Sequence, residues 1–379
     1  MIYFDNAATT NPKPPEVVKA VLDALKTKSV NPGRGGYDEA VALSGDIYKC
    51  RKKVSDFFSA NAPERVIFTA NCTTAINTVI KGICRPGDHI VASSLEHNAV
   101  ARPLYKLQKQ GAEVDYAEVI FGDKEATVRS FERLIREDTR LCICTHASNV
   151  TGTILPIAEI GEICARKGVP FAVDAAQTAG IVDINMQKMK IDYLCVASHK
   201  GLYAPMGTGI LIALGEIPKT LLEGGTGSLS ASYIQPNEFP DKFESGTVNV
   251  PGIIGIGSGI DFINSKGREK IYSHELMIIS RIYDGLLKTP RIRLYSERPK
   301  MNITVPTLSF NIEGMTSSEV ADILATKGFA TRAGLHCAPM AHRRLGTIDS
   351  GTVRVCSSAF STANEADAFI NAVKSIVKV

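Results

Sequence analysis

Short apolar segments alternate with longer segments of helical periodicity between residues 65 and 214, and this alternation constrains the fold most. The apolar segments are five to eight residues long and rich in Val, Ile, Phe and Tyr, as expected for buried strands. Strand and helix in turn predict a mainly parallel sheet covered by helices on both faces. Ligands of such sheets bind at the carboxyl ends of the strands. The predicted strands lie at residues 65–70, 89–93, 112–119, 140–147, 169–175, 191–198 and 210–214.

Two helices are predicted before the alternating region, and a long loop after it. The second helix is expected over about residues 38–58, whereas residues 222–251 lack periodicity and are rich in Gly, Ser, Asn and Pro, which predicts a functional loop. The first helix follows Pro15, and one of its faces is predicted to carry Val17, Val18, Val21, Leu22 and Leu25.

The C-terminal part has a different pattern, typical of a small α+β unit. A long helix near 256–287 precedes a strand around 303–312, and a strand is expected near 329–332. Capping boxes open two further helices, one at Thr316 to Glu319 and one at Thr362 to Glu365. We therefore predict an α/β fold with a large domain at residues 13–250, a small C-terminal domain at 251–379, and an N-terminal segment, 1–12, that packs with the small domain.

Composition narrows the class of protein. The net charge of +4 comes from interleaved acidic and basic residues, with no basic stripe for a nucleic acid, so we expect a small-molecule ligand. The first residues lack the pattern of a signal peptide, and no stretch approaches eighteen uninterrupted apolar residues, so neither secretion nor membrane insertion is expected. Most of the nine cysteines, including Cys142 and Cys144, lie in apolar segments, which favours core thiols in a reducing cytoplasm over disulfides or metal ligands.

The stretch IDYLCVASHKG at residues 191–201 ends a predicted strand in Ser198, His199 and Lys200. A hydroxyl, an imidazole and an amine there suit a ligand with both a phosphate and a carbonyl, such as pyridoxal phosphate. An isolated Ser-His-Lys triplet is more often a solvated loop. Asp174, however, ends the preceding predicted strand, 26 residues earlier, where a carboxylate can keep a pyridine nitrogen protonated. The two strand ends together favour the cofactor.

Nine motifs follow one another along nearly the whole chain: YFDNAATT, ANCTTAIN, SSLEHNAV, HASNVTG, VDAAQ, ASHKG, FESGTVN, RAGLHCAP and RVCSSAFST. In these motifs the chain resembles the class V aminotransferases, specifically the NifS-like cysteine desulfurases and selenocysteine lyases. The resemblance implies the aminotransferase-like fold of pyridoxal-phosphate-dependent transferases. It also implies that Lys200 bonds covalently to the cofactor, that Asp174 pairs with the pyridine nitrogen, that Asn149 and Gln177 approach the ring hydroxyl, and that Asn149 contacts the substrate.

The cofactor phosphate has several expected partners. Cys72 and Thr73 follow a strand and open a helix, so their backbone amides and the Thr73 hydroxyl can face a phosphate, although Cys72 is equally consistent with a packed residue that contributes backbone alone. Ser198 and His199 complete this site. By resemblance, Thr226 in GGTGS reaches the phosphate of a neighbouring subunit, which implies a homodimer with shared active sites; a plain flexible loop is the alternative.

Two further residues have roles implied by the resemblance. His97 stacks on the cofactor ring and can exchange protons, although a lone histidine is more often structural. Arg354 holds the substrate α-carboxylate, which suits the bidentate geometry of a guanidinium, and a surface ion pair is the alternative.

Cys337 lies in RAGLHCAPMAH, and its polar, glycine-flanked setting predicts a nucleophile and not an inert core cysteine. The basic residues near it would favour its thiolate if they approach it in space. They are Arg332, His336, His342, Arg343 and Arg344.

The predicted activity is cysteine desulfuration for iron–sulfur or other thio-cofactor assembly. Lys200 or His97 removes the Cα proton of the substrate, Cys337 takes the sulfur as a persulfide, and alanine leaves. The alternatives are a selenocysteine lyase, another β-lyase or aminotransferase, and a sulfur-trafficking scaffold without catalysis. The RAGLHCAP form resembles the group with a short cysteine loop, which implies a protein acceptor for the sulfur. Tyr37, where the family often has histidine, and Ser361, in place of the Asn of an FNT triplet, depart from the family pattern.

Overall fold

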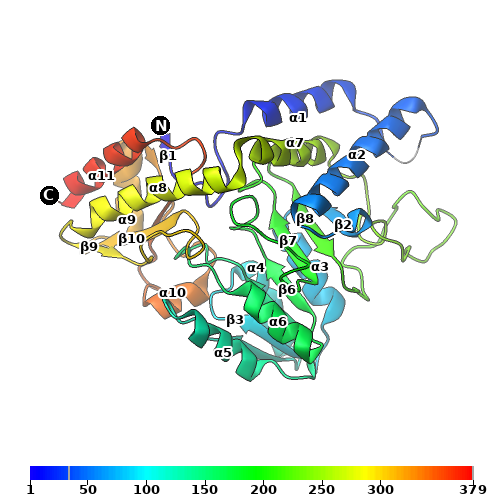
Figure 1. Ribbon diagram of the computed structural model, residues 1–379, viewed down its shortest axis with the longest axis horizontal. Coiled ribbons are helices and arrows are strands. Elements are labelled where there is room, and N and C mark those ends of the chain that lie inside the picture. The colour runs from blue at the N-terminus through cyan, green and yellow to red at the C-terminus, as the bar shows by residue number, and fades with distance from the viewer. Residues whose placement is uncertain (33–34, 378–379) are drawn as a thin grey trace.

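A seven-stranded sheet forms the centre of the larger part of the molecule (Figure 1). The computed structural model describes residues 1–32 and 35–377, so the last two residues of the predicted C-terminal domain lie outside the described residues. The strand order is β2-β8-β7-β6-β5-β3-β4, in which β8 runs antiparallel to both neighbours and the other pairs are parallel. The mainly parallel sheet is thus confirmed. The strands are β2 Val66–Thr69, β3 His89–Ser93, β4 Glu113–Ala117, β5 Thr139–Thr145, β6 Phe171–Asp174, β7 Tyr193–Ala197 and β8 Gly209–Ala213.

Helices cover both faces of this sheet, because its strands alternate their side chains between two apolar cores. In β5, Cys142 and Cys144 enter one core, whereas Leu141 and Ile143 enter the other. The prediction that both cysteines are core residues is therefore confirmed, and both lie on the same face of the sheet. The helices of this part are α1 Pro15–Thr27, α2 Asp38–Phe57, α3 Cys72–Ile83, α4 Asn98–Lys109, α5 Lys124–Leu134, α6 Ile157–Lys167 and α7 Val250–Lys266, with a 3₁₀ turn at Pro63–Arg65.

The predicted apolar face of α1 is only partly buried. Val17 and Ala24 are buried, whereas Val18, Leu22 and Leu25 are 54%, 47% and 56% exposed. The exposed three have the spacing i, i+4, i+7, so α1 presents a second apolar stripe to the outside.

A smaller antiparallel sheet of order β12-β10-β9 forms the C-terminal part. Strand β1 (Ile2–Tyr3) pairs there with β11 (Phe329–Ala330), which brings the N-terminal segment beside it (Figure 1). The capping boxes of Thr316 with Glu319 and of Thr362 with Glu365 are present as predicted. The remaining elements are α8 Arg268–Leu287, β9 Ile292–Leu294, β10 Thr307–Ile312, α9 Ser317–Thr326, α10 Pro339–Leu345, β12 Val353–Cys356 and α11 Ala363–Val377.

The single long helix expected over 256–287 is wrong, because Gly267 adopts a φ of +85° and separates α7 from α8. Apolar side chains of α7 such as Ile256 pack in the core of the large sheet, whereas Ile279 of α8 packs in the C-terminal core. The domain division at residues 12 and 250 stays a prediction. None of the helices in residues 1–32 and 35–377 is long and apolar enough to span a membrane.

Candidate active site

A pocket of about 230 Å³ lies at the carboxyl ends of the large-sheet strands, where sequence reasoning expects the ligand. Ten of the twelve predicted site residues line it, eight from the large-sheet region and two from the C-terminal part. They are Cys72, Thr73, His97, Asn149, Asp174, Gln177, His199, Lys200, Cys337 and Arg354, with Arg332 and His336 beside them.

 Of the other two predicted residues, Ser198 is buried and directly precedes His199, which lines this pocket. Thr226 lines a different pocket.

Lys200 follows β7 in a tight turn and is buried. Burial, and then the charge of Arg354, lowers the pKa of Lys200, which favours the neutral amine that attacks a carbonyl. The N-terminal segment packs on this turn, since Lys13 Nζ donates to the His199 carbonyl at 2.7 Å and Thr10 Oγ1 to the Lys200 carbonyl at 3.1 Å. Sequence reasoning assigned no role to either residue, because no local pattern links residues 10–13 to a turn almost 190 positions later.

Asp174 presents one carboxylate oxygen to the pocket. Its Oδ1 accepts the Ala176 N–H at 2.9 Å and the Cys72 thiol at 3.6 Å, whereas Oδ2 has no partner among the described residues. Burial raises the pKa of Cys72 well above its usual value, so this thiol keeps its proton and donates it. The Cys72 side chain therefore points to Asp174, while its backbone opens α3.

The other end of the pocket has free donors. Asn71 accepts the Thr74 N–H and caps α3, which leaves the N–H groups of Cys72 and Thr73 in the open first turn. Ser198 Oγ and His199 Nδ1 are buried and have no hydrogen-bond partner among the described residues. Buried polar atoms without partners are rare, so these atoms indicate a polar ligand. A phosphate fits these donors.

His97 is the N-cap of α4, and its Nδ1 accepts the Ala99 N–H at 3.0 Å. The neutral ring must therefore carry its proton on Nε2. Burial lowers the pKa of His97, which keeps the ring neutral at physiological pH.

Arg354 lies in β12 and is only 2% exposed. One of its terminal nitrogens donates to Asp5 at 2.9 Å and the other to the Asn149 carbonyl at 3.1 Å, while its buried Nε has no partner among the described residues. The alternative of a surface ion pair is therefore wrong. Asp5 lies in the motif YFDNAATT but was not predicted as a site residue. Nothing in the local sequence pairs it with Arg354, which is 349 positions away.

Cys337 is exposed, whereas the other eight cysteines are buried. Its carbonyl accepts the Asn98 N–H at 2.7 Å, and the carbonyl of His336 accepts the Asn149 side-chain amide at 2.8 Å. These bonds fix the Cys337 turn against the start of α4 and against the loop after β5.

The expected basic surroundings of Cys337 are largely wrong. Burial lowers the pKa of His336 to about 3 and also lowers that of His342, so both rings are neutral at physiological pH. Arg344 is paired with Glu118 at 2.6 Å. Of the five basic residues, Arg332 lines the pocket as a cation, and Arg343 is exposed on α10.

Thr226 lies in the long segment between β8 and α7, which contains neither helix nor strand. The loop predicted for residues 222–251 is thus confirmed up to residue 249, because α7 already begins at Val250. Thr226 Oγ1 bonds Ser228 Oγ at 3.1 Å and does not line the active-site pocket of its own chain. Its role toward a neighbouring subunit stays a prediction.

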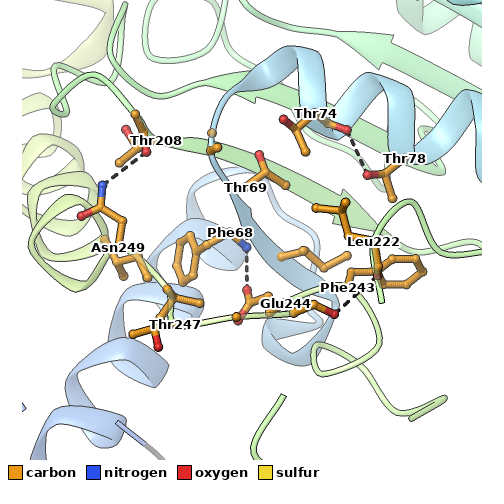
Figure 2. Close-up of a pocket in the computed structure, with 18 of the residues that line it drawn as sticks. Phe68, Thr69, Thr74, Thr78, Thr208, Leu222, Phe243, Glu244, Thr247 and Asn249 are labelled. Atoms are coloured by element: carbon orange, nitrogen blue, oxygen red, sulfur yellow. Dashed lines mark hydrogen bonds between the residues drawn. The ribbon is translucent and has the colours of Figure 1, made fainter. Parts of the chain in front are cut away.

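A different pocket, of about 310 Å³, lies between β2, α3 and the segment that carries Thr226 (Figure 2). Apolar side chains such as Phe68 and Leu222 line it, together with threonine hydroxyls and Glu244. None of its described lining residues is Lys, Arg, His or Cys, so it offers no amine or thiol for the predicted chemistry.

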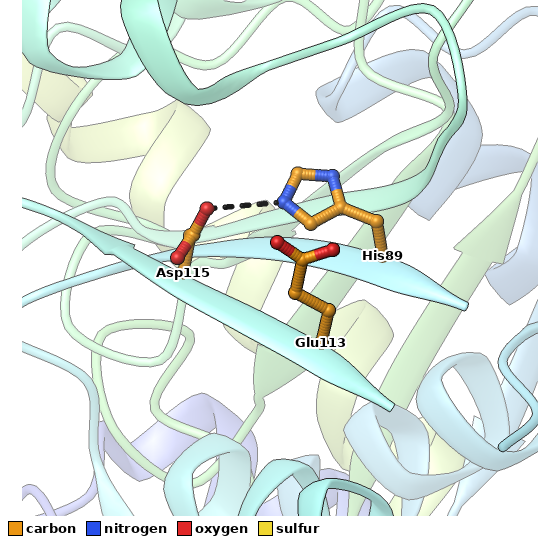
Figure 3. Close-up of side chains that lie close together, drawn as sticks. All are labelled: His89, Glu113 and Asp115. Atoms are coloured by element: carbon orange, nitrogen blue, oxygen red, sulfur yellow. Dashed lines mark hydrogen bonds and ion pairs between the residues drawn. The ribbon is translucent and has the colours of Figure 1, made fainter. Parts of the chain in front are cut away.

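A cluster of potential metal ligands, His89, Glu113 and Asp115, lies on β3 and β4 (Figure 3). Each has partners in the protein: His89 contacts Asp115 at 3.3 Å and Thr139 at 2.8 Å, and Glu113 pairs with Arg136 at 2.8 Å. These contacts account for the cluster as part of the sheet edge.

Comparison with known proteins agrees with the fold. The family model for aminotransferase class V matches residues 2–369, and the chain belongs to this family, whose members depend on pyridoxal phosphate. Within it, the chain is 34% identical to a probable cysteine desulfurase of Methanothermobacter thermautotrophicus, over 96% of this chain and 92% of the relative. A probable cysteine desulfurase of Pyrococcus abyssi is 31% identical over 100% and 94% of the two chains.

Solved structures show the same similarity. The apo cysteine desulfurase of Thermococcus onnurineus NA1 superposes with a TM-score of 0.92 at 31% identity, covering 100% of this chain and 94% of that one. The cysteine desulfurase CsdA of Escherichia coli, in an S-sulfonic acid form, gives 0.88 at 28% identity, covering 99% and 94%.

Proposed function

We propose that this chain is a cysteine desulfurase that converts L-cysteine to L-alanine and keeps the sulfur on Cys337 as a persulfide. The observation that carries the proposal is that Lys200, Asp174, Arg354 and Cys337 line one pocket. The full-length similarity to cysteine desulfurases supports it.

The residues of the pocket fit pyridoxal phosphate. Lys200 would hold the cofactor aldehyde, Asp174 Oδ2 the pyridine nitrogen, and Ser198, His199 and the first turn of α3 the phosphate. We also propose that Asn149 and Gln177 approach the ring hydroxyl, although both amides have partners in this structure, the His336 carbonyl at 2.8 Å and the Ala7 carbonyl at 3.2 Å. The bound cofactor supplies an electron sink that makes the Cα proton of an amino acid acidic.

Lys200 is the base in this proposal, and His97 is not. A base needs a free lone pair, but the Nδ1 lone pair of His97 accepts the Ala99 N–H and its Nε2 carries the proton. Burial lowers the pKa of Lys200, which favours the neutral amine that a base requires. His97 then serves to stack on the cofactor ring and to donate a proton from Nε2.

Arg354 and Cys337 act on the two ends of the substrate. Arg354 Nε, without a partner among the described residues, is available for the α-carboxylate of cysteine. The Cys337 sulfur forms a bond to the substrate sulfur while the substrate Cβ–S bond breaks, so cysteine and the Cys337 thiol become alanine and the Cys337 persulfide. The exposure of Cys337 supports delivery of this sulfur to a protein acceptor, for iron–sulfur or other thio-cofactor assembly.

We further propose a homodimer in the cytoplasm, with Thr226 reaching the phosphate of the neighbouring subunit. The outward apolar stripe of α1, together with Val41 and Tyr48 of α2, which are 62% and 56% exposed, supports a partner on this side. Buried free thiols support a reducing compartment. Sedimentation of the protein as a monomer at micromolar concentration would contradict the dimer.

The test is Cys337→Ala, assayed with cysteine and with selenocysteine. We expect the variant to keep absorbance near 420 nm, which reports bound cofactor, and to lose alanine and sulfide release from cysteine. Retained selenide release would indicate selenocysteine lyase activity in addition, because selenium depends less on a cysteine nucleophile. Cysteine turnover equal to that of the wild type would refute the persulfide mechanism.

A further inference from the structure

Two histidines stack beneath the Cys337 turn, and the proposed reaction uses neither. The rings of His336 and His342 lie 5.5 Å apart with an interplanar angle of 18°. Both residues are buried, and His342 comes from α10, the helix that follows the turn. Packing alone would be served by apolar residues, so their hydrogen bonds need an explanation.

The hydrogen bonds of this pair determine where each proton lies. His336 Nε2 lies 3.3 Å from the Arg332 carbonyl, which can only accept, so Nε2 carries the proton and Nδ1 is an acceptor. His342 Nε2, 3.3 Å from that Nδ1, must then donate, and His342 Nδ1 accepts from the Thr347 hydroxyl at 2.8 Å. The chain from Thr347 to Arg332 thus has one consistent arrangement with both rings neutral.

Burial keeps both imidazole rings neutral. It lowers the pKa of His336 to about 3, with a smaller contribution from the charges of Arg354 and Arg332, and it also lowers the pKa of His342. An added proton on either ring would place two donors face to face or displace the Thr347 hydroxyl.

The turn formed by His336 and Cys337, next to these hydrogen bonds, has a conformation that must be held in place. His336 and Cys337 have φ values of +50° and +56°, in the left-handed region that side chains other than Asn and Asp rarely adopt. The Asn98 N–H and the Asn149 amide hold the two carbonyls of this pair, and His342 holds the His336 ring from below.

We propose that His342 is a positioning residue for the desulfurase reaction: by donating to His336 Nδ1, it keeps the His336–Cys337 pair left-handed and the Cys337 sulfur at the mouth of the pocket. The inference rests on the proposed function for its catalytic consequence. It predicts that the hydrogen bond, and not the ring of His342, is what the reaction needs.

The experiment compares His342→Phe, which keeps a ring and removes the donor, with His342→Gln, which keeps an N–H donor. We expect His342→Phe to lower kcat for alanine release by about 10- to 100-fold, because a displacement near 1 Å costs about that much, and to leave the KM for cysteine within about twofold. His342→Gln should restore kcat to within about threefold of the wild type. Asp349→Asn, an exposed change beyond Thr347, is the matched control.

Amide exchange gives a second readout without substrate. Exchange of the Asn98 amide, which donates to the Cys337 carbonyl, should be about tenfold faster in His342→Phe, while peptides of β5 exchange as in the wild type. Thr347→Val, a milder and nearly isosteric change at the far end of the chain, should shift Asn98 exchange in the same direction if His342→Phe does not fold.

An equal loss of kcat in His342→Phe and His342→Gln would overturn the proposal. So would a His342→Phe variant with the kcat and the Asn98 amide exchange of the wild type. If the wild type releases no alanine from cysteine, the proposed function fails, while Asn98 exchange still decides whether His342 holds the turn.

Discussion

The segment that carries Thr226 is anchored by a buried ion pair, and removal of its negative charge should destabilise the protein strongly. Glu244 accepts two hydrogen bonds from the Arg51 guanidinium. It accepts a third, at 2.6 Å, from the Phe68 N–H (Figure 2). The two side chains are 9% and 8% exposed. Glu244→Gln keeps an acceptor for Phe68 but leaves a buried Arg51 cation without a counter-charge. The loss of one partner from a buried pair costs about 3–5 kcal/mol.

Urea unfolding followed by far-ultraviolet circular dichroism measures this loss, since the chain has no tryptophan for fluorescence. Glu216→Gln is the matched control, because it removes a carboxylate from an ion pair with Arg65 that is 27% and 75% exposed. Such an exposed pair contributes about 0–1 kcal/mol. Limited proteolysis should cleave residues 222–249 faster in Glu244→Gln than in Glu216→Gln. Equal urea midpoints and equal cleavage in the two variants would refute the reasoning.

Three further predictions concern the pocket and its supports. Arg354→Lys should raise the KM for cysteine by about 10- to 100-fold in steady-state assays, because a lysine loses the Nε donor available for the carboxylate, a hydrogen bond to a charged group worth about 1.5–3 kcal/mol; an unchanged KM would place the carboxylate elsewhere. Cys72→Ala should shift the absorption spectrum of the cofactor-loaded protein without substrate, because Asp174 Oδ1 loses a donor, whereas identical spectra across pH would leave the Cys72 thiol without a role. Burial raises the pKa of Glu275 to about 8, above about 4.3 in the unfolded chain, so its contribution to stability is full below about pH 4 and is lost as the pH rises toward 8. Glu275→Gln cannot ionise, so its urea midpoint relative to the wild type should increase from pH 6 to pH 9, and a constant difference would contradict this.

The large sheet could be predicted because each of its strands carries a local signal. Strands such as β3 and β7 are short apolar runs with polar residues directly after them, and buried parallel strands require that pattern. Lys200 and Asp174 could be predicted for the same reason, since Lys200 follows a strand and Asp174 ends one, and both strand ends are visible in sequence. The break at Gly267 was missed because apolar residues continue through it, and periodicity alone does not detect a single left-handed residue.

Residues that act through distant partners could not be predicted in this way. Asp5 and Lys13 reach Arg354 and the His199 carbonyl only after the N-terminal segment has folded onto the Lys200 turn and the C-terminal sheet. The exposure of part of the apolar face of α1 could not be predicted for a related reason: such a face can pack against one core or against a core and a partner, and local sequence does not distinguish them.

The surroundings of Cys337 show why charge is harder to predict than position. Sequence places five basic residues near this cysteine, but the charge of a histidine depends on burial, which the sequence does not give. In the structure, the two nearest histidines are buried and neutral, and their value to Cys337 is a set of directed hydrogen bonds. A thiol supported in this way is held at a fixed position and not surrounded by positive charge. Cys337 should therefore depend on the donor at position 342 more than on the number of cations around it.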